Sequence, residues 1–103
     1  MLDLQRVAGF EWDAGNRGKN QKHRVADGEA EQVFFSQPLL MLADVRHSGP
    51  ESRYHALGQT ADGRRLHVTF TLRDDEQFIR VISARDMHRK ERAIHDANGK
   101  EGP

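Results

Sequence analysis

The chain has no cysteine among its 103 residues. This absence excludes disulfide bonds, thiolate nucleophiles and zinc–sulfur sites, and it is typical of a cytoplasmic protein. The sequence also lacks any hydrophobic run that approaches the length of a membrane span. Residues 1–10 lack the basic start and apolar stretch of a signal peptide. We therefore expect a cytoplasmic protein with one domain over residues 1–97 and a flexible tail over residues 98–103.

An excess of charge of one sign is also missing, because 16 Lys and Arg balance 16 Asp and Glu. Overall charge therefore gives no argument for nucleic acid binding. The distribution is uneven, since residues 25–44 contain four acids and no base, whereas residues 80–92 contain five bases and two acids. Twelve of the bases are Arg, which suits two-pronged phosphate binding better than Lys does. This pattern indicates either a phosphate-binding region or two solvated helix faces.

The pattern of apolar residues and turn signals predicts five strands. Strict alternation, as a half-buried strand requires, is found at Leu66, Val68, Phe70 and Leu72. The Asp62-Gly63 pair before them is a hairpin signal, because Gly supplies the positive φ that such a turn needs. The other expected strands cover residues 7–11, 39–42, 53–57 and 78–83.

Two helices are expected between the first and second strands. Asp13 is a candidate N-cap for a helix over residues 14–23, although Gly15 and Gly18 each cost about 1 kcal/mol relative to Ala. Apolar residues at helical spacing predict the second helix over residues 27–35.

A last helix is expected at the end of the chain. Ser83 followed by Asp86 fits a capping pattern, so we predict a helix over residues 85–97. The expected fold class is α+β, with one strand, two helices, four strands and a C-terminal helix, and with an antiparallel sheet.

A series of short motifs, kept in order over roughly residues 9–93, resembles one known family. The motifs are Phe10-Glu11-Trp12-Asp13, Lys22-His23, Glu29-Ala30-Glu31, Val33-Phe34-Phe35, Pro38-Leu39-Leu40, His47-Ser48, Arg53-Tyr54, Leu57-Gly58, Arg65-Leu66, and residues 80–87 followed by Arg89-Lys90-Glu91-Arg92. They resemble the BrnT family of bacterial type II toxins. The resemblance implies a RelE-like fold, ribonuclease activity and a BrnA-type antitoxin as partner.

Three features depart from the family pattern. Near the end of the last helix the family often has an aromatic residue, whereas this chain has Ile94 and His95. The family usually has Gly after the Lys-His pair, whereas this chain has Arg24. If that position requires a left-handed backbone, Arg24 is strained by roughly 1 kcal/mol or more. The turn at residues 74–77 is also more acidic than the family pattern.

Metal-independent RNA cleavage needs a base for the 2′-hydroxyl proton, an acid for the leaving 5′-oxygen, and cations for the phosphorane. The proton-transfer candidates are His23, His47 and Glu51. Their alternative roles are structural: His23 caps a helix end, and His47 is a solvated loop histidine. Glu51 and Arg53 alternate toward one face, so a surface ion pair is the alternative for them.

Arginines are the phosphate-binding candidates. Arg80 lies on a predicted strand and points to one face of the sheet. Arg85 falls in the predicted first turn of the last helix, where a cation opposes the helix dipole, so phosphate binding is a reason for its presence. The alternative is an ion pair with Asp86 or Glu51. Lys22 adds a third cation.

Structural roles are assigned to the remaining candidates. We interpret His55 and His67 as cross-strand polar neighbours, and His88 and His95 as solvated residues. Base stacking is one interpretation of Trp12 and Tyr54, and packing in a core or interface is the favoured one.

The full catalytic candidate set is Lys22, His23, His47, Glu51, Arg53, Arg80 and Arg85. No carboxylates with metal spacing and no glycine-rich phosphate loop stand out, so we expect neither a metal nor a cofactor. The predicted function is a metal-independent ribonuclease toxin that acts on RNA and is neutralised by a BrnA-type antitoxin. The alternative is a non-catalytic module that only binds its antitoxin. DNA contact is expected only through the antitoxin, because the chain shows no helix-turn-helix pattern.

Overall fold

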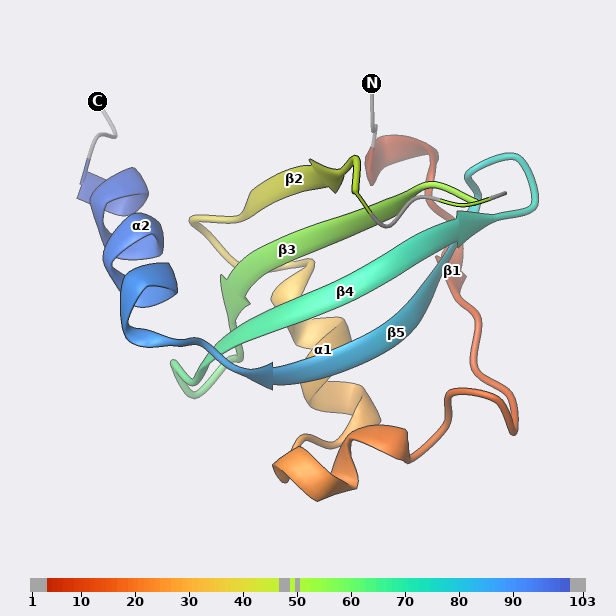
Figure 1. Cartoon of the computed structure of the whole chain (residues 1–103), viewed down its shortest axis with the longest axis horizontal. Coiled ribbons are helices and arrows are strands. Elements are labelled where there is room, and N and C mark those ends of the chain that lie inside the picture. The colour runs from red at the N-terminus through yellow and green to blue at the C-terminus, as the bar shows by residue number, and fades with distance from the viewer. Residues whose placement is uncertain (1–3, 47–48, 50, 101–103) are drawn as a thin grey trace.

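The computed structural model describes residues 4–46, 49 and 51–100. Five strands form one sheet in the order β1-β5-β4-β3-β2 (Figure 1). They are β1 Gly9–Phe10, β2 Leu40–Asp44, β3 Arg53–Gln59, β4 Arg65–Arg73 and β5 Phe78–Asp86. Strands β2 to β5 pair antiparallel in chain order, whereas β1 lies parallel to β5. The α+β class is confirmed, but the sheet is mixed because the N-terminal strand joins the outer edge of β5 in the same direction.

Burial alternates along β4 and gives the sheet two different faces. Leu66, Val68 and Phe70 have no exposed surface. Their neighbours point to the opposite side, because side chains alternate along a strand. We call the side of Leu66, Val68 and Phe70 the core face, and the side of His67, Thr69, Thr71 and Arg73 the polar face. The predicted hairpin precedes β4, and Gly63 has the positive φ, 86°, that its turn requires.

The core face is covered by α1, which spans Asp27–Val33 and passes behind the strands in Figure 1. Phe34 packs edge-on against Phe70, with ring centroids 4.9 Å apart. A Cβ on Gly58 of β3 would lie 2.8 Å from Val33 Cγ1, so glycine at that position lets the helix approach the sheet. The prediction of this helix is confirmed, although it ends two residues earlier than expected.

The segment before α1 is not the helix that we predicted over residues 14–23. It forms turns followed by a short 3-10 helix, η2, over Lys19–His23. Its buried asparagines bind the outer edge of β5, since Asn16 Nδ2 donates to the Val81 carbonyl at 3.0 Å and Asn20 Oδ1 accepts from the Ala84 N–H at 2.9 Å. These side chains satisfy edge groups beyond the end of β1, and such contacts outweigh weak helix propensity.

The predicted start of the last helix is also wrong. β5 continues to Asp86, and Ser83 pairs with Thr69 of β4 instead of capping a helix. The helix α2 spans Arg89–Lys100, beyond the expected end at residue 97. Its start is marked by the His88 N–H, which donates to Glu91 Oε1 at 2.8 Å. Strand pairing therefore takes precedence over a local capping pattern at Ser83.

α2 stands beside one end of the sheet, away from α1 (Figure 1). His95, which we predicted to be solvated, is buried beneath it, and its Nε2 donates to the Pro38 carbonyl at 3.0 Å. Within the described part of the chain, no helix has the length and apolar character needed to cross a bilayer. A second 3-10 helix, η1, occupies Leu4–Arg6 near the N-terminus.

Non-glycine residues adopt left-handed backbone conformations at two places. Arg24 ends η2 with a φ of 59°, so the conformation suspected for this position is present. The acidic turn between β4 and β5 has three such residues in succession, Asp74, Asp75 and Glu76, with φ of 54°, 56° and 69°. An L side chain is unfavourable in this region, and each residue costs on the order of 1 kcal/mol.

Candidate functional site

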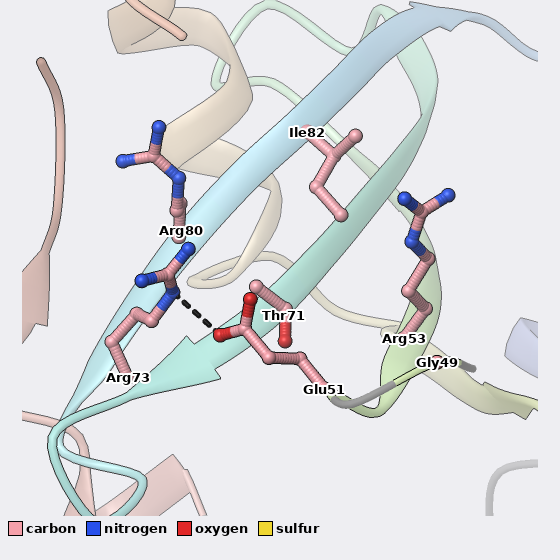
Figure 2. Close-up of a pocket in the computed structure, with 7 residues that line it drawn as sticks. All are labelled: Gly49, Glu51, Arg53, Thr71, Arg73, Arg80 and Ile82. Carbon is pink, nitrogen blue, oxygen red and sulfur yellow. Dashed lines mark ion pairs between the residues drawn. The ribbon is translucent and has the colours of Figure 1, made fainter. Parts of the chain in front are cut away.

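A pocket of about 310 Å³ lies on the polar face of the sheet (Figure 2). Three of the side chains that line it are arginines, and these come from three adjacent strands. Arg53 of β3 pairs in register with Thr71 of β4, which pairs in turn with Arg80 of β5. Arg73 lies two residues beyond Thr71, on the same face. The other residues lining the pocket are Gly49, Glu51 and Ile82.

Arg80 is held in place by two carboxylates from the segment after β1. Its Nη1 lies 2.8 Å from Glu11 Oε1 and 2.9 Å from Asp13 Oδ2, and its Nη2 lies 3.0 Å from Asp13 Oδ1. The hydrogen bond from Arg80, followed by that from the Gly15 N–H, lowers the pKa of Asp13. A Cβ on Gly15 would lie 2.7 Å from Arg80 Nη2, so this glycine makes room for the guanidinium.

Arg73 is the partner of Glu51 in the pocket. The Arg73 Nε lies 2.7 Å from Glu51 Oε2, and Figure 2 shows the contact. The two atoms are close enough for an ion pair. The surface pair that we considered between Glu51 and Arg53 is therefore replaced by a pair between Glu51 and Arg73.

A bulge in β5 determines where Arg85 points. Thr69 pairs with Ser83 and Phe70 pairs with Val81, so Ile82 is one extra residue in β5. Simple alternation would place Arg80 and Arg85 on opposite faces, because they are five residues apart. The extra residue cancels this difference, and Arg85 pairs with His67 on the polar face. Arg85 thus lies on a strand, not in the first turn of a helix as we predicted.

Two histidines lie on the polar face between the pocket and α2. His55 Nε2 lies 2.8 Å from Asp44 Oδ2, and His55 Nδ1 lies 2.9 Å from His67 Nε2. This confirms them as polar neighbours on adjacent strands. Burial, reinforced by the charge of Arg85, lowers the pKa of His67 to about 4. His67 is therefore neutral at pH 7, and its 3.6 Å approach to Glu91 Oε2 is not an ion pair there.

Glu91 of α2 lies beside His67, on the side away from His55. Both of its oxygens accept hydrogen bonds from Arg85, at 2.8 and 3.0 Å. Burial alone would raise the pKa of Glu91, but the bonds from Arg85 and from the His88 N–H outweigh it and lower the pKa to about 2. The ion pair that we considered between Arg85 and Asp86 is formed instead by Arg64, whose Nε lies 2.7 Å from Asp86 Oδ1.

The predicted catalytic residues are only partly brought together. Glu51, Arg53 and Arg80 line one pocket. Arg85 shares their face but lies at its other end. Lys22 and His23 are exposed in η2, and His47 lies outside the described residues.

Sequence reasoning missed Arg73 and Thr71, which also line the pocket. The alternation of β4 contained the signal, because residues between buried apolar positions must point to the opposite face. Trp12 and Tyr54 have the packing roles that we favoured. Trp12 Nε1 donates to Glu31 Oε2 at 2.7 Å, and Tyr54 stacks on Phe70 with ring centroids 5.5 Å apart.

Among the residues that the structure describes, no three His, Cys, Asp or Glu side chains are grouped so that they could hold a metal ion. In a comparison with known families, residues 12–91 match the family described as the ribonuclease toxin BrnT, of a type II toxin–antitoxin system. No curated protein matches the chain.

Proposed function

The chain belongs to the BrnT family of ribonuclease toxins of type II toxin–antitoxin systems, and we propose that it cleaves RNA in the cytoplasm without a metal ion, at the pocket on its polar face. We also propose that its domain shares the RelE-like toxin fold. The antiparallel strands β2 to β5, backed by α1 on one face, are consistent with that assignment.

The row of arginines on three neighbouring strands is the observation that carries this proposal. Guanidinium groups bind phosphate through paired N–H donors, and strands hold such groups more rigidly than loops do. Arg53, Arg73 and Arg80 line the same pocket, where Glu51 is the carboxylate among the lining residues. Glu51 lies beside these guanidinium groups, since its Oε2 is 2.7 Å from Arg73 Nε.

The proposed reaction is a transesterification. Glu51 takes the proton of the 2′-hydroxyl, the 2′-oxygen attacks phosphorus, and the bond from phosphorus to the 5′-oxygen breaks. The leaving 5′-oxygen takes a proton from water, so the products are a 2′,3′-cyclic phosphate and a 5′-hydroxyl. The arginines stabilise the additional charge on the phosphorane. Lys22, His23 and Arg85 act outside this pocket, in binding the rest of the RNA.

We propose a BrnA-type antitoxin as the partner that a toxin of this family requires. The outer side of α2 exposes Arg89, Lys90 and Arg92, which suits an acidic or mixed partner surface. Charge reversal at Arg89 and Arg92 should weaken the complex, as titration calorimetry can measure. Unchanged affinity would count against this site. DNA is contacted only through the antitoxin.

A purified chain tests the ribonuclease proposal. Incubation with RNA, with and without ribosomes and with excess EDTA, should give fragments ending in 2′,3′-cyclic phosphate. Arg80→Ala and Glu51→Gln should slow cleavage about 100-fold or more. Arg6→Ala is the matched control, because Arg6 pairs with Glu76 on the exposed surface, 3.6 Å away. Intact RNA with a folded wild-type chain would favour the alternative, a module that only binds its antitoxin.

A further inference from the structure

α2 is attached to the domain mainly through polar contacts. Ile94, an apolar residue of the helix, is 51% exposed. The side chains that reach the sheet are charged or polar: Arg65 Nη1 pairs with Asp96 at 3.3 Å, and Arg85 holds Glu91. Met87, just before the helix, and His95 are its buried anchors. A helix with so little apolar contact is easier to displace than α1, which covers the core.

The strongest of these contacts lies on a residue suited to binding RNA. Glu91 occupies both Nη atoms of Arg85, in the two-pronged arrangement that a phosphate group also adopts with arginine. The contact is partly shielded, since the Arg85 and Glu91 side chains are 28% and 22% exposed. A phosphate cannot bind these nitrogen atoms while Glu91 is in place.

Polar side chains connect the contact between Arg85 and Glu91 to the pocket along the polar face. Arg85 pairs with His67, whose ring contacts His55, and His55 lies two residues from Arg53 at the pocket wall. The polar face therefore carries a continuous row of cationic and imidazole side chains. One half of this row is open as the pocket, and α2 closes the other half.

We propose that α2 is an intramolecular plug that competes with RNA, with Glu91 occupying the place of a phosphate on Arg85. This inference rests on the proposed function, because the competitor is the RNA substrate. Arg80 shows the contrast. Both of its Nη atoms are also bound by carboxylates, Glu11 and Asp13, but these come from the segment after β1, and no residue of α2 lines the pocket beside Arg80.

A binding experiment can distinguish two roles for Glu91, competing with RNA for Arg85 or orienting Arg85 for RNA. If Glu91 only oriented Arg85 for RNA, removing its charge would weaken RNA binding. If Glu91 competes with phosphate, removing its charge strengthens binding. The sign of the change therefore distinguishes a plug from a positioning residue.

The test measures binding of a single-stranded 2′-O-methyl oligoribonucleotide, which cannot be cleaved by 2′-oxygen attack, by fluorescence anisotropy. Glu91→Gln keeps the side-chain size and should bind about tenfold tighter than wild type. The salt dependence should also steepen by roughly 0.7 in log–log slope, as expected for one more phosphate contact. In the double variant with Arg85→Ala, the gain should disappear.

The matched control is Glu29→Gln, which makes the same substitution at a carboxylate that pairs with Arg64, 3.4 Å away. An equal gain in this control would show an effect of overall charge alone and would overturn the plug. No gain in Glu91→Gln, or weaker binding, would overturn it as well. Cleavage by wild type without a gain in Glu91→Gln leaves the ribonuclease proposal standing and removes only the plug. A gain in binding without cleavage by any variant supports the plug and removes the ribonuclease proposal.

Discussion

Along β4, Leu66, Val68 and Phe70 are closed off from solvent, whereas His67 and Arg73 lie on the other side of the same nine-residue strand. The core face contacts α1 and aromatic rings. The polar face carries the arginine pocket and the histidine pair. The backbone is shared, so the difference lies entirely in which side chains point to which layer. A substitution on one face should therefore reduce stability, and a substitution on the other should reduce activity.

The largest expected effect is on the core face. Phe70→Ala removes a fully buried ring that contacts Phe34 and Tyr54, and it should lower the free energy of unfolding by about 3–5 kcal/mol. Urea titration followed by circular dichroism measures this change. Phe35→Ala is the control, because that ring is 79% exposed and its loss should matter little. Equal losses in the two variants would contradict the assignment of the core face.

The next effect is expected on the polar face. Arg73→Ala should slow RNA cleavage about 100-fold, equivalent to about 2.7 kcal/mol, because it removes a cation from the proposed phosphate site. Its unfolding free energy should fall by at most about 1 kcal/mol, since its ion pair with Glu51 is partly exposed. Cleavage rates and urea titration of the same preparation check both values. A stability loss as large as that of Phe70→Ala would contradict the assignment of stability to the core face and activity to the polar face.

The pH dependence of stability sharpens the comparison, because His67 is a polar-face residue that is partly buried. Its pKa is about 4 in the folded chain and near 6.5 when unfolded. The unfolded chain therefore binds more protons between these values, and stability falls as the pH decreases through this window. The expected loss from this residue is roughly 2 kcal/mol between about pH 7 and pH 5. In His67→Gln, the urea concentration at the unfolding midpoint should change less with pH than in wild type. His88→Gln, at an exposed position, should leave this pH dependence unchanged.

The smallest effect is expected outside both faces. Arg24→Gly replaces a residue at φ 59° with one that adopts this conformation without strain. The free energy of unfolding should rise by about 0.5–1 kcal/mol, with cleavage unchanged. Thermal and urea unfolding measure it. A decrease would show that the Arg24 side chain makes contacts that outweigh backbone strain.

Sequence patterns predicted the parts of the fold that depend on local periodicity. The alternation of β4, the turn at Gly63 and the helix α1 were all visible in this way. The patterns failed at Ser83 and over residues 14–23, where pairing with β5 determines the structure. Such pairing depends on residues far away in the chain, so no local pattern reports it.

The candidate site was less predictable than the fold. Glu51, Arg53 and Arg80 were proposed from the sequence and lie in one pocket. Arg73 was missed because it follows Leu72, the last apolar residue of the alternating pattern, so the pattern did not mark it as part of the strand. The contact between Arg85 and Glu91 could not be predicted, because it depends on where β5 ends and α2 begins. β5 extends to Asp86 and α2 begins at Arg89, both later than the sequence pattern indicated.

The extra residue at Ile82 explains why Arg80 and Arg85 project from the same side of the sheet although an odd number of positions separates them. Deleting Ile82 would turn β5 into a regular strand, because the adjacent residues Phe70 and Thr69 already pair with Val81 and Ser83. Ala84 would stay in the hydrocarbon interior, and the guanidinium of Arg85 would stay on the opposite side. Engineers who shorten this hairpin can therefore remove Ile82 without changing the orientation of the residues that follow. Alignments that slide one gap across positions 81–83 would confuse lining residues with interior ones.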